Sequence, residues 1–223
     1  MRSPIFTLAL LVALATACSG DDAPADVPDP EVPGRDSNPE GVPYPTDGIG
    51  ALERASGRRG NRMPNLTFQA YVDGDRSKGL QSVSLADFYD PEQKRYKVLD
   101  IQVGQTWCSI CSAETQATVQ VERELRAEGV VFLQVMTSGN DPSRGPALEE
   151  IDGWVDRHAM TYTLGIDVRS RRMTALGATT VPYDILVDLR TMEILDSSAG
   201  APVNVARYVR EGIAWVDTHP PSY

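Results

Sequence analysis

The 223-residue chain has few of the side chains that form structural zinc sites or disulfide frameworks, with only three cysteines and two histidines. Three cysteines allow a single disulfide and one remaining thiol, which excludes the class of multiply cross-linked exported domains. Tetrahedral zinc needs four ligands, and neither His158 nor His219 has ligand spacing, so we expect no metal site. We expect His158 instead to be a solvated cation near the end of a helix.

Long hydrophobic runs and basic charge are also scarce. The apolar run Ile5–Ala17 is shorter than the roughly 20 residues that a membrane-spanning helix needs. Lysine and arginine number 21 against 31 acidic residues, a formal net charge of −10. That balance argues against nucleic acid or an anionic membrane surface as a partner. With 41% hydrophobic residues, the chain can build one globular domain with appendages.

The N-terminus has the pattern of an export signal. Arg2 supplies positive charge, an apolar run follows, and small residues precede Cys18. The stretch Leu14–Cys18 resembles a bacterial lipobox, which implies that Cys18 is lipidated and becomes the mature N-terminus. An ordinary secretory signal with an incidental cysteine is the alternative. Both place the protein in a compartment where disulfides persist, the periplasmic side of a bacterial envelope. Ser19 favours the outer membrane if enteric sorting rules apply.

Composition divides the chain into three parts. We expect residues 1–17 to be a signal peptide, residues 18–60 a lipid-anchored flexible linker, and residues 61–223 the folded domain. In most of the linker, prolines alternate with acidic residues and there is no apolar periodicity. Such a segment cannot bury enough surface to offset its ordering entropy, so a semi-extended tether is the expected structure.

Within the folded part, strand patterns alternate with helix patterns. The strand patterns cover residues 66–72, 96–103, 130–136, 162–166, 184–188 and 192–195, and the helix patterns cover 109–128, 148–159, 169–176 and the segment after 202. Ala113, Ala117, Val121 and Leu125 recur at four-residue spacing, so we expect them to form the buried face of the first long helix. The alternation predicts an α/β fold with a mixed central β-sheet flanked by helices.

The stretch Trp107-Cys108-Ser109-Ile110-Cys111 lies between a strand pattern and a helix pattern. Free backbone N–H groups and the helix dipole at such a position favour thiolate over thiol. We therefore expect Cys108 to be a nucleophile near neutral pH, with Cys111 one turn away on the same helix face. This spacing suits a disulfide that forms and breaks, a redox centre that needs no further cofactor.

Together with Val181-Pro182 before a strand hairpin, this motif resembles the thioredoxin fold. The match is closest to the TlpA/ResA-like thiol-disulfide oxidoreductases, within the superfamily that includes AhpC/TSA proteins, and covers about residues 63–216. The resemblance implies an added N-terminal strand region and a helix-strand insertion between Gly139 and Asp167. It also implies that Pro182 is a cis-proline and that Val181 offers backbone hydrogen bonds to an incoming cysteine-containing partner.

The resemblance implies a role for each remaining site residue. Cys108 exchanges with a partner disulfide through a mixed disulfide, and Cys111 resolves it. Glu114 stands where the family carries an active-site glutamate, as a proton acceptor for Cys111 or as a charge that raises the pKa of both thiols. An exposed first-turn glutamate that complements the helix dipole is the alternative. Trp107 either shields the dithiol or fills the core.

The sequence departs from the family beside the motif. Ser109-Ile110 stands where the family places a proline before the second cysteine, so the resemblance does not set the reduction potential. Gln102 stands where thioredoxins carry a buried aspartate, and Asp100 is two residues away.

These features predict an exported, lipid-anchored and monomeric oxidoreductase. Its expected partners are cysteine-containing client proteins, of the apocytochrome c or copper-site kind, and a membrane electron donor that makes it a reductant. A redox-inactive binding lipoprotein with a structural disulfide is the main alternative. A copper chaperone-like protein is a second alternative, although that class has a three-residue gap between its cysteines and the gap here is two. A peroxiredoxin would place a threonine where Gln105 stands.

Overall fold

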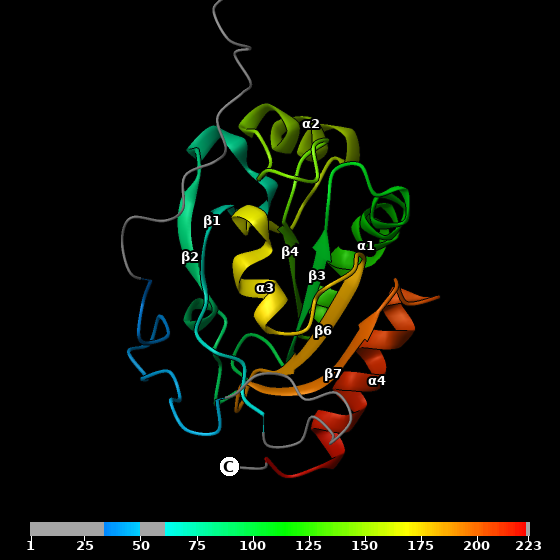
Figure 1. Cartoon of the computed structure of the whole chain (residues 1–223). Coiled ribbons are helices and arrows are strands. Elements are labelled where there is room, and N and C mark those ends of the chain that lie inside the picture. The colour runs from blue at the N-terminus through cyan, green and yellow to red at the C-terminus, as the bar shows by residue number, and fades with distance from the viewer. Residues whose placement is uncertain (1–33, 50–60, 222–223) are drawn as a thin grey trace, which may run out of the picture.

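The computed structural model describes residues 34–49 and 61–221. Its centre is a seven-stranded mixed sheet with the order β2-β1-β5-β4-β3-β6-β7 (Figure 1). The strands are β1 (Thr67–Tyr71), β2 (Gln81–Ser84), β3 (Val98–Gly104), β4 (Val130–Met136), β5 (Thr163–Ile166), β6 (Tyr183–Asp188) and β7 (Glu193–Ala199). The helices are α1 (Ser109–Ala127), α2 (Leu148–His158), α3 (Arg171–Ala175) and α4 (Val205–Thr218). The predicted α/β fold with a mixed sheet is confirmed.

Parallel pairing is confined to the middle of the sheet. β3 pairs parallel with β4, and β4 pairs parallel with β5. The strands outside this centre pair antiparallel. All seven residues of β4 are buried, as expected for an apolar strand covered on both faces. The edge strand β2 was not predicted, because Gln81–Ser84 has only one large apolar side chain and no clear alternation.

Two apolar cores cover the two faces of the sheet. One contains Met173 and Leu176 at α3, together with Leu99, Ile101 and other inward residues of the strands. The other collects residues of α1, α2 and α4, including Leu125, Trp154 and Val209. Figure 1 shows α3 crossing in front of the sheet. Both cysteines belong to the core beneath α1, α2 and α4.

Residues 34–49 correct the predicted extent of the linker. Tyr44 is buried and its hydroxyl donates a hydrogen bond of 2.7 Å to the carbonyl of Met63. The buried Asn38 donates to the carbonyl of Tyr89 at 3.1 Å and accepts from the amide of Val42 at 2.8 Å. These contacts give the segment enough buried surface and hydrogen bonds to join the folded unit, which its proline content did not indicate. The rest of the linker, the signal peptide and Cys18 lie outside the described residues.

Among the described residues, no helix combines the length and apolar character needed to cross a membrane.

Candidate active site

Strand β3 delivers the Cys-x-x-Cys motif to the start of α1. Cys108 is the N-cap residue of α1, and its Sγ accepts a hydrogen bond of 3.1 Å from the amide of Cys111. The two sulfur atoms are bonded at 2.14 Å, with the Cα atoms 5.3 Å apart. The predicted geometry of the motif is therefore present, with Cys108 at the positive end of the helix dipole. That end of the helix stabilises a thiolate when the bond is broken.

The two sulfurs differ in access, and apolar side chains surround them. Cys108 is 6% exposed and Cys111 is fully buried. The neighbouring Trp107 and Ile110 are 50% and 58% exposed. Trp107 therefore does not fill the core, and the alternative role given to it above is wrong. An attacking thiolate would reach the disulfide at Cys108, beside two exposed apolar side chains.

The Val181–Pro182 segment lies on the same side of the domain as Trp107. The peptide bond between these residues is cis, as the resemblance implied. Val181 packs against the core cluster that contains both cysteines. It also lines a hollow of about 490 Å³ with Trp107, whose other walls are Gln105, Thr137, Ser170, Thr174, Ala178, Thr179 and Thr180. The fold thus brings together two segments more than 70 residues apart in the sequence.

The buried face of α1 is polar, which corrects the predicted face. Ala113 and Ala117 are exposed and Val121 is half-buried, so of the four predicted residues only Leu125 is buried. The other buried residues of α1 are Cys111, Glu114, Thr115, Thr118 and Glu122. A pattern that counts only apolar residues cannot find this face, because polar side chains of the sheet bind it.

Two glutamines on adjacent strands bind the polar face of α1. The side-chain amide of Gln102 donates to the Thr118 hydroxyl at 2.9 Å and to a carboxyl oxygen of Asp100 at 3.2 Å. The Gln102 carbonyl accepts a hydrogen bond of 3.2 Å from the Tyr162 hydroxyl. Gln102 stands where thioredoxins carry an aspartate, and here it is a neutral link in a buried network.

Gln134, which pairs with Gln102 in the sheet, binds the next turn of α1 toward the cysteines. Its amide donates to the Thr115 hydroxyl at 2.7 Å, and its carbonyl accepts from the indole N–H of Trp154 at 3.0 Å. The Thr115 hydroxyl donates in turn to the carbonyl of Cys111 at 2.9 Å. A continuous set of hydrogen bonds therefore connects the centre of the sheet to Cys111.

Three acidic side chains meet under α1, and we call them the carboxyl cluster: Asp100 of β3, Glu114 of α1 and Asp184 of β6. Glu114 is 4% exposed, and the two aspartates are fully buried. Asp184 pairs with Gln102 across the antiparallel β3–β6 ladder, and Asp100 pairs with Leu186 in the same ladder. Both oxygens of Asp184, one of Glu114 and one of Asp100 meet no N–H or O–H donor among the described residues, so these carboxyl groups can bond to each other only where one carries a proton. Glu114 is therefore not the exposed glutamate of the alternative interpretation.

Burial and mutual repulsion change the protonation of the carboxyl cluster. Burial raises the pKa of Glu114 to about 7, against the opposing effect of a hydrogen bond with Asp184. Burial, with the charges of Asp100 and Glu114, raises the pKa of Asp184 to about 11. Burial and the charge of Glu114 also raise the pKa of Asp100. At neutral pH the cluster holds protons that ordinary carboxyl groups would have lost.

The aspartates of this cluster are the functional candidates that sequence reasoning missed. Asp184 was interpreted as an ordinary strand residue, and Asp100 was noted only as a neighbour of Gln102. A signal was present, because each aspartate stands between two large apolar residues of a strand. A charged residue in a strand covered on both faces needs either a partner or a proton.

His158 is buried, contrary to the expected solvated cation. It is 5% exposed, its Nε2 lies 3.3 Å from the Ser112 hydroxyl, and its ring packs on Trp154 at 4.5 Å. Burial, with the charge of Arg157, lowers its pKa. The α2 helix turns this residue inward because it lies one turn after Trp154. Among the described residues, no group of three or more His, Cys, Asp or Glu could hold a metal ion.

Comparisons with known proteins identify the fold. No protein-family profile and no curated protein sequence matches the chain. A structure from Chlorobium tepidum described as a thiol:disulfide interchange protein DsbE has a TM-score of 0.54 and 15% identity, over 70% of this chain and 94% of that one. The thioredoxin domain of a Bacteroides vulgatus thiol-disulfide oxidoreductase has a TM-score of 0.53 and 17% identity, over 69% and 96%. AhpC of Enterococcus faecalis has a TM-score of 0.54 and 13% identity, over 78% and 99%. These likenesses confirm the expected thioredoxin-like fold.

Proposed function

We propose that this chain is a thiol-disulfide oxidoreductase that exchanges the Cys108–Cys111 disulfide with cysteine-containing proteins. The observation that carries the proposal is the position of the disulfide. It lies at the N-terminus of α1 in a thioredoxin-like fold, and the cis Val181–Pro182 segment packs against the same core cluster. Similar folds from Chlorobium tepidum and Bacteroides vulgatus are described as thiol-disulfide proteins, which supports the same chemistry here.

In the reducing direction, the Cys108 thiolate attacks a sulfur of the client disulfide. A Cys108–client bond forms, and the other client sulfur leaves as a thiolate. The Cys111 thiol then loses its proton to the Glu114 carboxylate, and the Cys111 thiolate attacks the Cys108 sulfur. The Cys108–Cys111 bond forms, the bond to the client breaks, and the second client sulfur leaves as a thiolate. Two electrons pass to the client, and a dithiol donor at the membrane restores the reduced protein.

Three further residues hold the client in this proposal. Trp107 and Val181 line one hollow beside the cysteines and offer apolar surface to the segment around the client cysteine. The backbone of Val181, which precedes Pro182 and lines the same hollow, pairs with that segment. Reduction of apocytochrome c or copper-site cysteines, a monomeric state, and attachment to the outer membrane through lipidated Cys18 complete the proposal. Membrane fractionation and mass analysis of the wild type and a Cys18→Ala variant test the attachment.

The decisive test is the reduction potential of the Cys108–Cys111 pair in the folded protein, equilibrated against defined thiol buffers. A value near that of thioredoxin, about −270 mV or lower, supports a reductant. A value near about −120 mV reverses the direction of electron flow. If reduction requires denaturant, the pair is structural, and the redox-inactive binding protein takes the place of this proposal. The low exposure of both sulfurs makes that second candidate a serious one.

Trapping variants identify the client. Cys111→Ser leaves Cys108 able to form a mixed disulfide but removes the resolving thiol, so client proteins should stay attached in the envelope. The matched control, Cys108→Ser, keeps one thiol in the same motif but buries it at position 111. It should trap no client, and equal trapping by both variants would contradict the assigned roles.

A further inference from the structure

The strongest feature that the proposed mechanism leaves unused is the contact between Glu114 and Asp184. Both side chains are buried, both carry oxygens that meet no N–H or O–H donor among the described residues, and a hydrogen bond between them lowers the pKa of Glu114 and raises that of Asp184. An ionised carboxylate only accepts hydrogen bonds, so two ionised carboxylates in contact would leave a repulsive, unpaired arrangement. One proton between them turns the same contact into a favourable hydrogen bond to a charged acceptor.

The surroundings assign that proton to Asp184. This residue is fully buried on β6, and the charges that act on it are acidic: Asp100 on β3, Glu114 on α1 and Asp196 on β7. On α4, the Tyr208 hydroxyl donates a hydrogen bond of 3.2 Å to Asp196. Tyr162, next to β5, binds Gln102 rather than a member of the carboxyl cluster. The pKa of Asp184 is accordingly raised to about 11, whereas that of Glu114 reaches only about 7.

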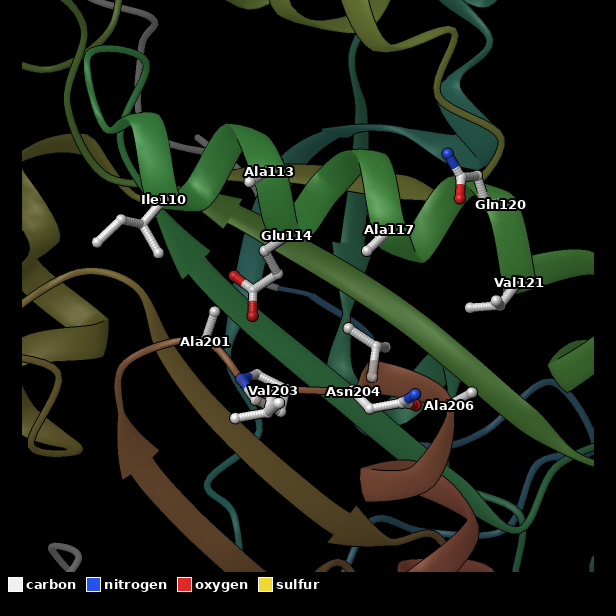
Figure 2. Close-up of a pocket in the computed structure, with 12 residues that line it drawn as sticks. Ile110, Ala113, Glu114, Ala117, Gln120, Val121, Ala201, Val203, Asn204 and Ala206 are labelled. Carbon is white, nitrogen blue, oxygen red and sulfur yellow. The ribbon is translucent and has the colours of Figure 1, made fainter.

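Glu114 differs from Asp184 in its access to solvent. It forms part of a groove of about 380 Å³ between α1 and the segment before α4. The other residues that line this groove are apolar or carry an uncharged amide, so Glu114 is its one ionisable residue. Figure 2 shows its carboxylate pointing from α1 toward the segment that carries Ala201 and Val203. A proton taken up by Glu114 can therefore leave to water through this groove.

Glu114 also lies three residues after Cys111, which puts the two side chains on the same face of α1. We propose that Asp184 carries a proton at neutral pH and donates a hydrogen bond to Glu114. Asp184 is then a positioning residue that keeps Glu114 ionised as the proton acceptor for Cys111. This inference rests on the proposed function. The step it serves is balanced: the proton moves from the Cys111 sulfur to the Glu114 carboxylate, and the sulfur electron pair then forms the bond to Cys108. Asp184 keeps its own proton throughout.

The test follows the two steps of oxidation with an aromatic nitrobenzoate disulfide, whose released thiolate is coloured. In the reduced full-length protein, attack by Cys108 releases the first equivalent and closure by Cys111 releases the second. The rate of the second release, measured against pH, reports the proton transfer. D184L removes the hydrogen-bond donor. In this variant, we expect the midpoint of the pH profile of the second release to rise by about one pH unit or more, and the rate of that release at neutral pH to fall about tenfold.

The matched variant D184N keeps a neutral donor at the same place, so its pH profile should stay within about 0.3 units of the wild type. D196N removes an acidic residue of the neighbouring strand that does not contribute to the pKa shift of Glu114. This variant should also leave the pH profile of the second release unchanged. In an E114Q background, D184L should have no further effect on the second release. Circular dichroism and thermal unfolding check that each variant folds.

Three outcomes overturn the inference: an unshifted profile in D184L, a shift to lower pH in D184N, or a further effect of D184L in E114Q. The second would mean that Asp184 is ionised and repels Glu114. If D184L does not fold, D184N decides between these states by itself. Failure of the proposed function has a different signature, because the wild type would then release no first equivalent at any pH in the absence of denaturant.

Discussion

The buried carboxyl groups of Glu114 on α1 and Asp184 on β6 shift each other's pKa through a hydrogen bond, which lowers that of Glu114 and raises that of Asp184, and the charges acting on Asp184 are all negative. Such a pair costs folding free energy whenever both groups are ionised. A purely structural contact between α1 and the sheet could use apolar residues at lower cost. The pair therefore fits a site where protons are exchanged, and Glu114 lies about one helical turn after the buried Cys111 on α1.

The pKa of Glu114 predicts how stability depends on pH. Its folded pKa, about 7, lies above the ordinary value of 4.5, so the folded state holds a proton that the unfolded state has lost. The contribution to stability is complete below about pH 4.5 and is lost as the pH rises through 7. We expect the free energy of unfolding of the oxidised protein to fall by about 2–3 kcal/mol from this group alone between these values. Urea unfolding at several pH values measures it.

The comparison with E114Q isolates this effect, because a neutral amide does not titrate. The difference in unfolding free energy between E114Q and the wild type should increase with pH up to about pH 7 and then level off. The matched control is Glu124→Gln, which alters an exposed glutamate of the same helix. It should follow the pH dependence of the wild type. A constant difference between E114Q and the wild type would mean that Glu114 has an ordinary pKa.

Replacing Trp107 should weaken the reaction with a protein client without much effect on the stability of the fold. Its side chain is half-exposed beside Cys108 and lines the hollow that Val181 shares. W107A should lower kcat/KM for a protein disulfide about tenfold or more, because exposed aromatic anchors dominate binding. Its free energy of unfolding should change by about 1 kcal/mol at most. Turnover with a protein disulfide and urea unfolding measure the two quantities.

Trp215 provides the control for W107A. It is 37% exposed near the C-terminal end of α4, where it stacks on His219. W215A removes a tryptophan of similar exposure outside the hollow and should leave kcat/KM unchanged. Equal losses in the two variants would remove Trp107 from the proposed client site.

The elements of the fold could be predicted because their apolar patterns are local. The strand Val130–Met136 is apolar at every position except Gln134, and the start of α1 carries the dithiol motif. The buried face of α1 could not be predicted this way, because Thr115 and Thr118 are buried by hydrogen bonds to Gln134 and Gln102, which come from other strands. Such pairings exist only once the sheet is assembled.

The candidate site could likewise be predicted only in part from the sequence. Cys108, Cys111 and Glu114 follow one another at three-residue spacing at the start of α1 and are visible in the motif. Asp184 joins them only through the antiparallel register of β3 and β6, which places it opposite Gln102. The residue spacing within any single segment carries no information about that register. The segment around Tyr44 was misassigned for a related reason, since its binding surface is formed by distant residues.

Thr118 tests whether the polar face of α1 contributes to stability. Its hydroxyl accepts from the Gln102 amide at 2.9 Å in a fully buried place. T118V keeps the shape of the side chain but leaves that amide without this acceptor, so the free energy of unfolding should fall by about 1–3 kcal/mol. T118S keeps the hydroxyl and should lose less. If T118V is as stable as the wild type, the glutamine network does not hold α1 on the sheet.

Tyr44 tests whether residues 34–49 belong to the folded unit. The ring is buried and contacts Tyr89 edge-on at 5.8 Å, and the hydroxyl donates to the Met63 carbonyl. Y44A removes a large buried side chain and should lower the free energy of unfolding by about 3 kcal/mol or more. Y44F removes only the hydrogen bond and should cost about 1 kcal/mol. Asp36→Ala changes an exposed side chain of the same segment and should stay within about 0.5 kcal/mol of the wild type. Urea unfolding of the full chain measures all three variants. If their free energies of unfolding are equal, residues 34–49 are part of the linker, because a tether contributes nothing to the stability of the domain that it carries.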